Sequence, residues 1–292
     1  MKLVATYTTN ELGSDPAVLR DFAQAAEGAG YTRLTMGEHV LGADPDRPGG
    51  WTGPYTHETA WSEPFPTFGY LAAVTERIEF MTGVLILPQR QTAVVAKQAA
   101  HLDVLCGGRF VLGVGTGWNP VEYEALGQDF HTRGQRMDEQ ITLLRMLWRD
   151  PVVTFEGRWD RVTQAGLNPL PPRRDIPIWM GGGAPQAIAR VGRLGDGWYP
   201  LVQDLEAVRD GMKLMRASAE AAGRDPDSLG LQCAVRGDDL DGRLAAAESF
   251  AELGATHLAF STGGLGLKSP QQHIEALTGF AEALTAHGSA VR

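Results

Sequence analysis

The sequence predicts an α/β fold, a single (β/α)8 barrel that spans residues 1–292, and three observations support this prediction. Short apolar runs alternate with amphipathic stretches eight times along the chain. The apolar runs are uninterrupted, as expected for parallel strands that are covered on both faces. No dinucleotide-binding fingerprint follows the first run, which argues against the alternative, a doubly wound open sheet.

The eight apolar runs are the predicted strands. They lie at residues 3–7, 33–36, 78–82, 110–114, 176–180, 197–199, 229–234 and 257–260. Parallel strands joined by helices need right-handed crossovers, and eight such units close most naturally into a barrel.

The helices between the strands carry start and stop signals. Asp15 followed by Pro16 is typical of a helix N-terminus, and Ser269-Pro270 begins the last helix in the same way. The helix that ends at Asp150-Pro151 has a buried face with a 3.6-residue period, made of Met137, Ile141, Leu144 and Trp148.

Two segments interrupt this alternation. Residues 41–70 follow the second strand and form a long loop, which we expect to be a lid at the carboxyl end of the barrel. The loop is rich in aromatic and imidazole side chains, namely Trp51, Tyr55, His57 and Trp61. Residues 152–175 precede the fifth strand, and the segments 152–155 and 159–162 predict a small structural hairpin on the opposite face.

Composition and charge exclude several classes of partner. The net charge of −9 argues against nucleic acid or an anionic membrane as the main partner. The apolar runs are far shorter than the ~20 residues that cross a bilayer, and residues 1–7 resemble a strand rather than a secretory leader. Cys106 and Cys233 are far apart, so we expect reduced thiols and a cytoplasmic location.

His39 is the best catalytic candidate because it follows the second predicted strand. Barrel active sites are built from residues just after the strands, and an imidazole can exchange a proton near neutral pH. The alternative is a structural histidine bonded to Glu38 or to backbone. No cysteine–histidine cluster has the spacing of a metal site, so no metal is expected.

Glycine-rich loops offer a place for a phosphate and a flat ligand. The loop after the fifth strand, Gly181, Gly182, Gly183 and Ala184, leads into a helix whose N-terminus favours an anion. The loop at residues 261–266 is an equal candidate, because barrels frequently bind phosphate there. After the fourth strand, Gly115, Thr116 and Gly117 would allow a flat group to approach, and Trp118 would form an aromatic wall.

Several segments together resemble a known family over residues 3–200. They are Met36-Gly37-Glu38-His39, Gly83-Val84-Leu85-Ile86-Leu87-Pro88, Leu112-Gly113-Val114-Gly115-Thr116-Gly117-Trp118, Glu124-Ala125-Leu126-Gly127 and Gly195-Asp196-Gly197-Trp198. In order and spacing they are similar to the luciferase-like monooxygenase superfamily, and within it to the bacterial branch of F420-dependent oxidoreductases.

The resemblance implies a flavin-like ring across the carboxyl end of the barrel. It implies a non-prolyl cis peptide at Gly83-Val84 against which the ring bends, and it assigns the phosphate to Gly181, Gly182, Gly183 and Ala184. His39 matches a histidine near the reactive carbon of the ring. The remaining residues that the resemblance brings to the cofactor are Glu38, Gly115, Thr116 and Gly117.

Two positions depart from the family pattern. Deazaflavin enzymes often have aspartate where this chain has Glu38. The sugar-phosphate dehydrogenases of the family have a catalytic glutamate where this chain has Trp118, so Trp118 is a catalytic candidate by position and glucose 6-phosphate is not an expected substrate.

The resemblance implies an F420-dependent oxidoreductase that transfers hydride between the deazaflavin and a small organic substrate. An FMN-dependent monooxygenase served by a separate flavin reductase is the alternative. A flavin-binding protein with little turnover is a third possibility, because Trp118 replaces an acid. A homodimer is expected from the resemblance, and a reductase for the flavin or F420 is a conceivable partner.

Overall fold

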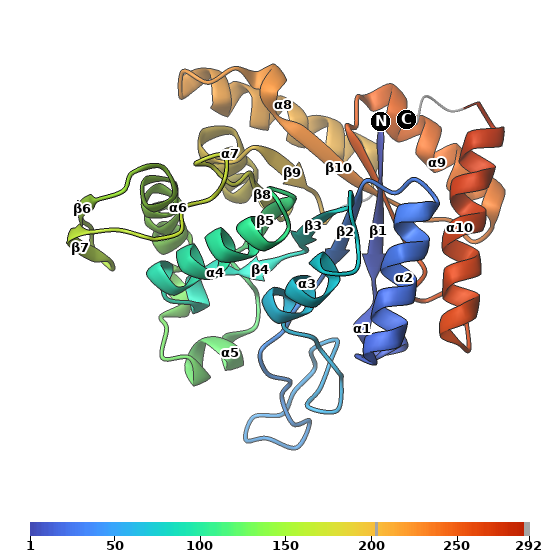
Figure 1. The fold of residues 1–292 in the computed structure, drawn as a ribbon, viewed down its shortest axis with the longest axis horizontal. Helices are drawn as coiled ribbons and strands as arrows, with labels where there is room; N and C mark the ends of the chain where they lie inside the picture. The colour runs from blue at the N-terminus through green and yellow to red at the C-terminus, as the bar shows by residue number, and fades with distance from the viewer. Residues whose placement is uncertain (202–203, 289–292) are drawn as a thin grey trace.

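The computed structural model describes residues 1–201 and 204–288, which form a closed barrel of parallel strands surrounded by helices (Figure 1). The first and last strands are neighbours, with Leu3 opposite Leu258. The predicted (β/α)8 barrel, or TIM barrel, is therefore confirmed. The described residues fill eight strand positions, one of them split in two: β1 (Lys2–Tyr7), β2 (Arg33–Met36), β3 (Glu79–Thr82) with β4 (Leu85–Ile86), β5 (Phe110–Gly115), β8 (Ile178–Gly181), β9 (Gly197–Tyr199), β10 (Gly230–Val235) and β11 (His257–Ser261).

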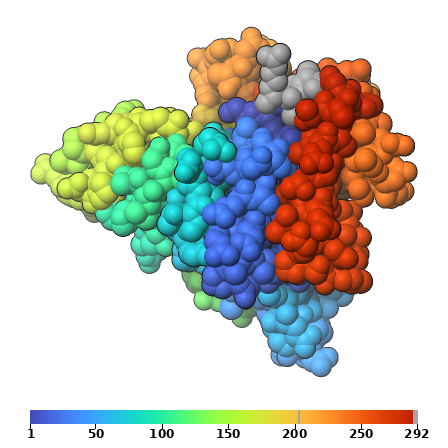
Figure 2. All heavy atoms as spheres, turned by 45° about the vertical axis from the view of Figure 1, so that its right-hand side comes forward, coloured from blue at the N-terminus to red at the C-terminus, as the bar shows by residue number. Residues whose placement is uncertain are grey.

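Helices cover the outside of the barrel, and α2 and α10 lie side by side on the face seen in Figure 2. The longer helices are α2 (Pro16–Gly28), α3 (Pro64–Ala72), α4 (Thr92–Leu105), α6 (Arg133–Arg149), α7 (Pro185–Leu194), α8 (Leu205–Ala221), α9 (Leu240–Leu253) and α10 (Pro270–Ala286). Short helices are α1 (Thr9–Leu12), α5 (Pro120–Ala125), η1 (Leu87–Gln89), η2 (Phe130–Thr132) and η3 (Pro226–Ser228). Within the described ranges, no helix combines the length and apolarity needed to cross a bilayer.

The predicted helix starts are confirmed by their hydrogen bonds. The Asp15 carboxylate accepts the Ala17 N–H at 2.7 Å, and the Ser269 hydroxyl accepts the Gln272 N–H at 3.4 Å. These side chains satisfy backbone donors that have no partner inside the helix.

The third barrel strand is interrupted between β3, which ends at Thr82, and β4, which begins at Leu85. Phe80 of β3 pairs with Phe110 of β5, and Leu85 of β4 pairs with Val114 further along the same strand. Between the two strands the Gly83-Val84 peptide is cis, as the family resemblance implied. The Thr82 hydroxyl bridges the gap, because it donates to the Gly113 carbonyl at 2.6 Å and accepts the Gly113 N–H at 2.9 Å.

The long loop after β2 is shorter than predicted. It ends at Glu63, because α3 begins at Pro64, inside the predicted range 41–70. The Glu63 carboxylate accepts the Phe65 N–H at 2.8 Å, and Pro64 occupies the first helical position, where proline is well tolerated. Residues 41–63, hereafter the lid, project from the end of the barrel where the strands finish, beside α5 (Figure 1).

The predicted hairpin before the fifth barrel strand is confirmed as β6 (Val153–Glu156) paired antiparallel with β7 (Arg161–Ala165). The hairpin was expected at the amino-terminal end of the barrel, and this is only partly right, because its turn lies toward the carboxyl end. Asp160 in the turn accepts the hydroxyl of Thr92, the first residue of α4, at 2.7 Å. The Glu139 carboxylate also accepts three backbone N–H groups of the turn at 2.7–2.8 Å, which fixes the hairpin against α6.

Side chains close the amino-terminal end of the barrel. The buried Arg33 guanidinium pairs with Glu79 at 2.8 Å, lies 4.7 Å from the Trp179 ring and donates to Gln232 at 3.3 Å. All four residues lie at or near the beginnings of strands. The end with a ligand cavity is therefore the carboxyl end, where barrel enzymes place their sites.

Candidate active site

A cavity of about 420 Å³ opens at the carboxyl end of the barrel. Its wall comes from the ends of β1, β2, β5 and β8 and from the β3–β4 junction. It brings together most of the predicted site residues, namely Glu38, His39, Gly83, Val84, Gly115, Thr116, Gly117, Trp118, Gly181 and Gly182. Gly183 and Ala184 lie further out, on the exposed loop that leads into α7.

Val84 rests against two residues that have no side chain. A Cβ atom on Gly115 would lie 2.7 Å from Val84 Cγ2, and one on Gly181 would lie 3.1 Å from Val84 Cγ1. Any larger residue at Gly115 would push Val84 out of place. Glycines on β5 and β8 thus leave room for the β3–β4 junction to enter the barrel mouth, where Val84 forms an apolar floor.

The His39 imidazole is held by groups from two segments, the lid and α5. Its Nδ1 lies 2.6 Å from the Tyr55 hydroxyl of the lid and 3.2 Å from Glu122 Oε1 of α5. Asn119, the N-cap of α5, donates to the same Tyr55 hydroxyl at 2.8 Å. An ionised carboxylate only accepts hydrogen bonds, so the Glu122 contact favours a proton on Nδ1. Nε2 remains without a hydrogen-bond partner among the described residues and is free to meet a ligand.

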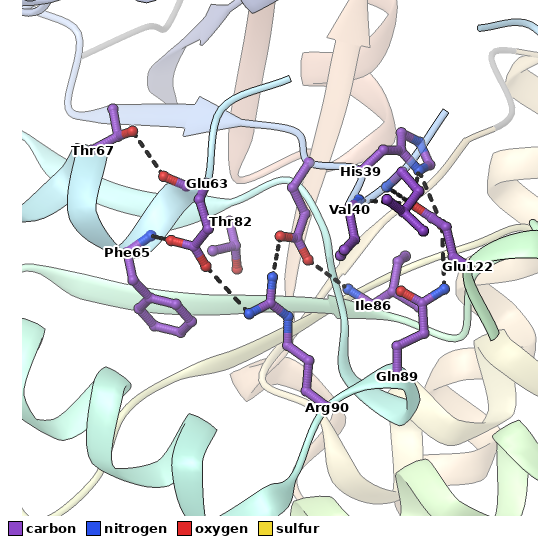
Figure 3. A network of polar contacts seen from close by, with 12 residues as sticks. His39, Val40, Glu63, Phe65, Thr67, Thr82, Ile86, Gln89, Arg90 and Glu122 are labelled. Atoms are coloured by element: carbon purple, nitrogen blue, oxygen red, sulfur yellow. Dashed lines mark hydrogen bonds and ion pairs between the residues drawn. The ribbon is translucent and has the colours of Figure 1, made fainter. Parts of the chain in front are cut away.

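Glu122 is almost fully buried and is surrounded by donors (Figure 3). It accepts the Val40 N–H at 2.7 Å, the Leu41 N–H at 3.3 Å and the Gln89 side-chain amide at 3.3 Å, in addition to the imidazole. Burial alone raises the pKa of Glu122. The hydrogen bonds and the charge of His39 outweigh burial, so the net pKa lies below its ordinary value of 4.5. Glu122 is therefore an anion at neutral pH.

Glu122 and Asn119 were not predicted as site residues. A local signal was present, because Asn119-Pro120 is a helix start directly after the glycine loop. Residues three apart share one face of a helix, which places Asn119 and Glu122 on the same side. Their contact with His39, 83 positions from Glu122, could not be read from local sequence.

Glu38 does not offer its carboxylate to the cavity. One oxygen forms an ion pair with Arg90, and the other accepts the Ile86 N–H at 3.4 Å. Arg90 also pairs with Glu63 at 3.2 Å. Glu38 therefore ties β2 to β4 and to the start of α3. This is a structural role in the wall of the cavity.

Aromatic rings of the lid pack against Trp118. The Trp51 and Trp118 rings are stacked with centroids 5.8 Å apart, and the Tyr55 ring meets Trp118 edge-on at 5.6 Å. Trp61 packs against His39 at 4.8 Å. Trp118 remains 46% exposed and makes no hydrogen bond within the described chain. Its position suits a wall that excludes water better than a proton donor.

Three polar atoms in the wall have no partner. The Trp61 indole N–H and the hydroxyls of Thr8 and Thr9 are buried without a hydrogen bond among the described residues. Buried polar groups are nearly always paired, so a ligand with polar edges would complete them. An apolar floor, a free imidazole nitrogen and orphaned donors together fit a planar ring with polar edges.

A second cavity of about 500 Å³ adjoins the first and shares Thr6, Thr8 and Asn10 with it. It lies at the ends of β9, β10 and β11. Residues 261 and 263–265, part of the second glycine-rich loop of the sequence, line it together with Arg236. Arg236 was not predicted as a site residue, although it directly follows β10 and the strand-end rule that located His39 applies to it as well.

The chain is similar in sequence to an uncharacterised protein and to a named dehydrogenase. An uncharacterised protein of Mycobacterium tuberculosis is 39% identical over 183 residues, which cover 60% of this chain and 62% of that protein. An F420-dependent hydroxymycolic acid dehydrogenase of the same organism is 33% identical over 223 residues, which cover 74% of this chain and 58% of that protein. These alignments span less than two thirds of the relatives' own length.

The solved structures and the family comparison agree on the fold. The crystal structure of the monooxygenase RslO1 from Streptomyces bottropensis superimposes with a TM-score of 0.82 at 19% identity, and covers 99% of this chain and 100% of that chain. At this identity the likeness shows the barrel alone. The model of the luciferase-like monooxygenase family, however, matches residues 3–286. The chain therefore belongs to the luciferase-like monooxygenase family.

Proposed function

We propose that this chain is an F420-dependent oxidoreductase that acts on a small organic substrate. The observation that carries the proposal is a cavity lined both by His39, whose Nε2 has no partner among the described residues, and by the apolar Val84. A relative at 33% identity is named an F420-dependent dehydrogenase, which favours the deazaflavin over FMN. When bound, the deazaflavin supplies two-electron hydride transfer.

Residues at the strand ends would hold the cofactor. Val84 would support the ring, with Trp61 and Thr9 available to bond its polar edge. Gly182 would lie near the phosphate, and the N-terminus of α7 would add a favourable dipole two residues further on. These contacts would use side-chain donors that have no partner within the described residues, and backbone that no side chain covers at Gly182.

His39 would move the proton that accompanies the redox change. His39 lines the ligand cavity and its Nε2 has no partner among the described residues, while Glu122 would balance the positive charge of a doubly protonated imidazole. The lid would exclude water, because its aromatic rings close over His39 and Trp118.

The cofactor can be identified by titration. We expect F420 to bind at micromolar concentrations, seen as quenching of the cofactor's or the protein's fluorescence on mixing. We expect FMN to cause no change in fluorescence, because it does not bind. Tight FMN binding without F420 binding would overturn the proposal and favour a monooxygenase. Oxygen uptake by the protein with reduced cofactor provides an independent readout, which we expect to stay at the background rate.

A further inference from the structure

We propose that the second cavity binds the anionic group of the substrate, a carboxylate or a phosphate, through Arg236. This inference deepens the oxidoreductase function proposed above and rests on it. The substrate would span the two adjoining cavities, with its oxyanion at Arg236 and its reacting carbon near His39. The substrate class is therefore a small organic acid or phosphate ester.

Arg236 differs from the other arginines of the protein. Throughout residues 1–201 and 204–288, every other arginine side chain makes at least one hydrogen bond or ion pair, and Arg236 makes neither. A guanidinium carries five donors in a planar fork that suits carboxylate and phosphate oxygens. Arg236 lies in the wall of a cavity, where a ligand can reach it.

Two hydroxyl groups in the same wall also lack partners. The Thr8 hydroxyl is buried without a hydrogen bond, and the Tyr199 hydroxyl makes none among the described residues. Burial raises the pKa of Tyr199, and the positive charge of Arg236 partly offsets this, so the two groups are close enough to interact. A cation and two neutral donors form a set that suits one oxyanion.

The other charges of the cavity wall do not occupy Arg236. Glu11 accepts the Gly264 N–H at 2.8 Å and lies 3.8 Å from His273. Asp238 forms no ion pair with Arg236 at or below 4.0 Å within the described chain. Arg243 donates to the Gly237 carbonyl at 3.1 Å, and its charge adds to the attraction for an anion.

The position of the cavity favours the substrate over the cofactor as the source of the anion. Gly181 and Gly182, proposed for the cofactor phosphate, line the first cavity and not the second. The shared wall of Thr6, Thr8 and Asn10 joins the two spaces on the β1 side. The apolar Phe260 and Leu265 complete the second cavity and suit the carbon skeleton of an organic acid.

Calorimetry on the cofactor-free protein tests the anion preference directly. The probes are phenylacetate and phenyl phosphate, with phenylacetamide as the neutral match. We expect the anions to bind at least about tenfold more tightly than the amide, and Arg236→Gln to lose this preference. Arg161→Gln removes the same charge from the exposed hairpin and should retain it. Equal binding of anions and amide, unchanged binding in Arg236→Gln, or no anion binding at millimolar concentrations would each overturn the inference.

A second titration separates substrate from cofactor. F420 and the ribityl deazaflavin, which lacks the phosphate and anionic tail, are titrated into the wild type and Arg236→Gln. We expect the variant to bind both as the wild type does. Selective loss of F420 affinity would mean that Arg236 serves the cofactor tail and would overturn the inference. If F420 does not bind at all but the anion preference persists, the cofactor assignment fails and the anion site stands.

Discussion

His39 and Glu122 illustrate how one residue defines the chemistry of another. Burying a carboxylate costs free energy unless donors surround it, and Glu122 has donors from the lid, from η1 and from the imidazole. The carboxylate in turn favours a proton on Nδ1, the ring nitrogen that it contacts. Nε2 is then left without a partner among the described residues, on a ring that lines the cavity.

Replacement of His39 tests its catalytic role. We expect His39→Ala to reduce turnover by about 100-fold or more, because the proton-transfer group is lost, with only a modest loss of cofactor affinity. Steady-state kinetics and a fluorescence titration measure the two effects separately. His57→Ala, a lid variant outside the cavity wall, should behave as the wild type. Unchanged turnover in His39→Ala would remove the residue from the mechanism.

The lowered pKa of Glu122 makes a pH-dependent contribution to stability. A carboxyl group with a lowered pKa stabilises the folded state above its unfolded value, near 4.5, and this stabilisation disappears as the pH falls through the folded value. We expect Glu122→Gln to be less stable at neutral pH and to lose less stability on acidification below about pH 4.5. Urea unfolding at a series of pH values measures this difference.

Glu124 provides the matched control for that experiment. Its side chain is 76% exposed, and its one ion pair, with Arg47 at 3.5 Å, lies at the surface of the described chain. Glu124→Gln should therefore follow the acid dependence of the wild type. Identical curves for the Glu122 and Glu124 variants would show that the buried contacts contribute nothing to stability.

At the scale of elements, the junction between β3 and β4 is part of the barrel wall and also places Val84 in the first cavity. Two short strands pair with different parts of β5, and the Thr82 hydroxyl replaces the backbone pairing that is missing between them. Val84 enters the barrel mouth only because the strand is interrupted at this point. The same interruption that weakens the sheet therefore creates the floor of the cavity.

Thr82→Val measures this contribution. Loss of the hydroxyl leaves the Gly113 N–H and carbonyl buried without their partner, so we expect a loss of about 1–3 kcal/mol in the free energy of unfolding. Thr82→Ser retains the hydroxyl, so its free energy of unfolding should fall by less than that of Thr82→Val. Chemical denaturation measures both variants. Equal stability of Thr82→Val and the wild type would contradict the bridging role.

Sequence patterns predicted the barrel because eight buried strands leave continuous apolar runs. They missed β4, since Leu85–Ile86 is too short to form a recognisable run. They also missed the start of α3, where Pro64 and Pro66 resemble loop residues. The strand-end rule located His39 and the glycine loops, and it applies equally to Arg236, which directly follows β10 and was missed. The role of Glu122 depends on contacts between distant segments that local sequence does not encode.

At the scale of the whole molecule, the two ends of the barrel differ: side chains fill one end, and the other holds the cavities. The Arg33 cluster fills the amino-terminal end, and the carboxyl end holds two adjoining cavities, the first of which is lined by Trp61 of the lid. Glycines at strand ends line the first cavity, and the second is lined by Arg236, which has no partner among the described residues. This division would let a ring and an anionic substrate lie next to each other within reach of His39.

A crystal structure of the protein with bound F420 tests the central claim most directly. We expect the ring to lie against Val84 with its reactive carbon beside His39 Nε2, and the phosphate to lie near Gly182. A ring bound outside this cavity, or oriented with His39 remote from the reactive carbon, would contradict the account.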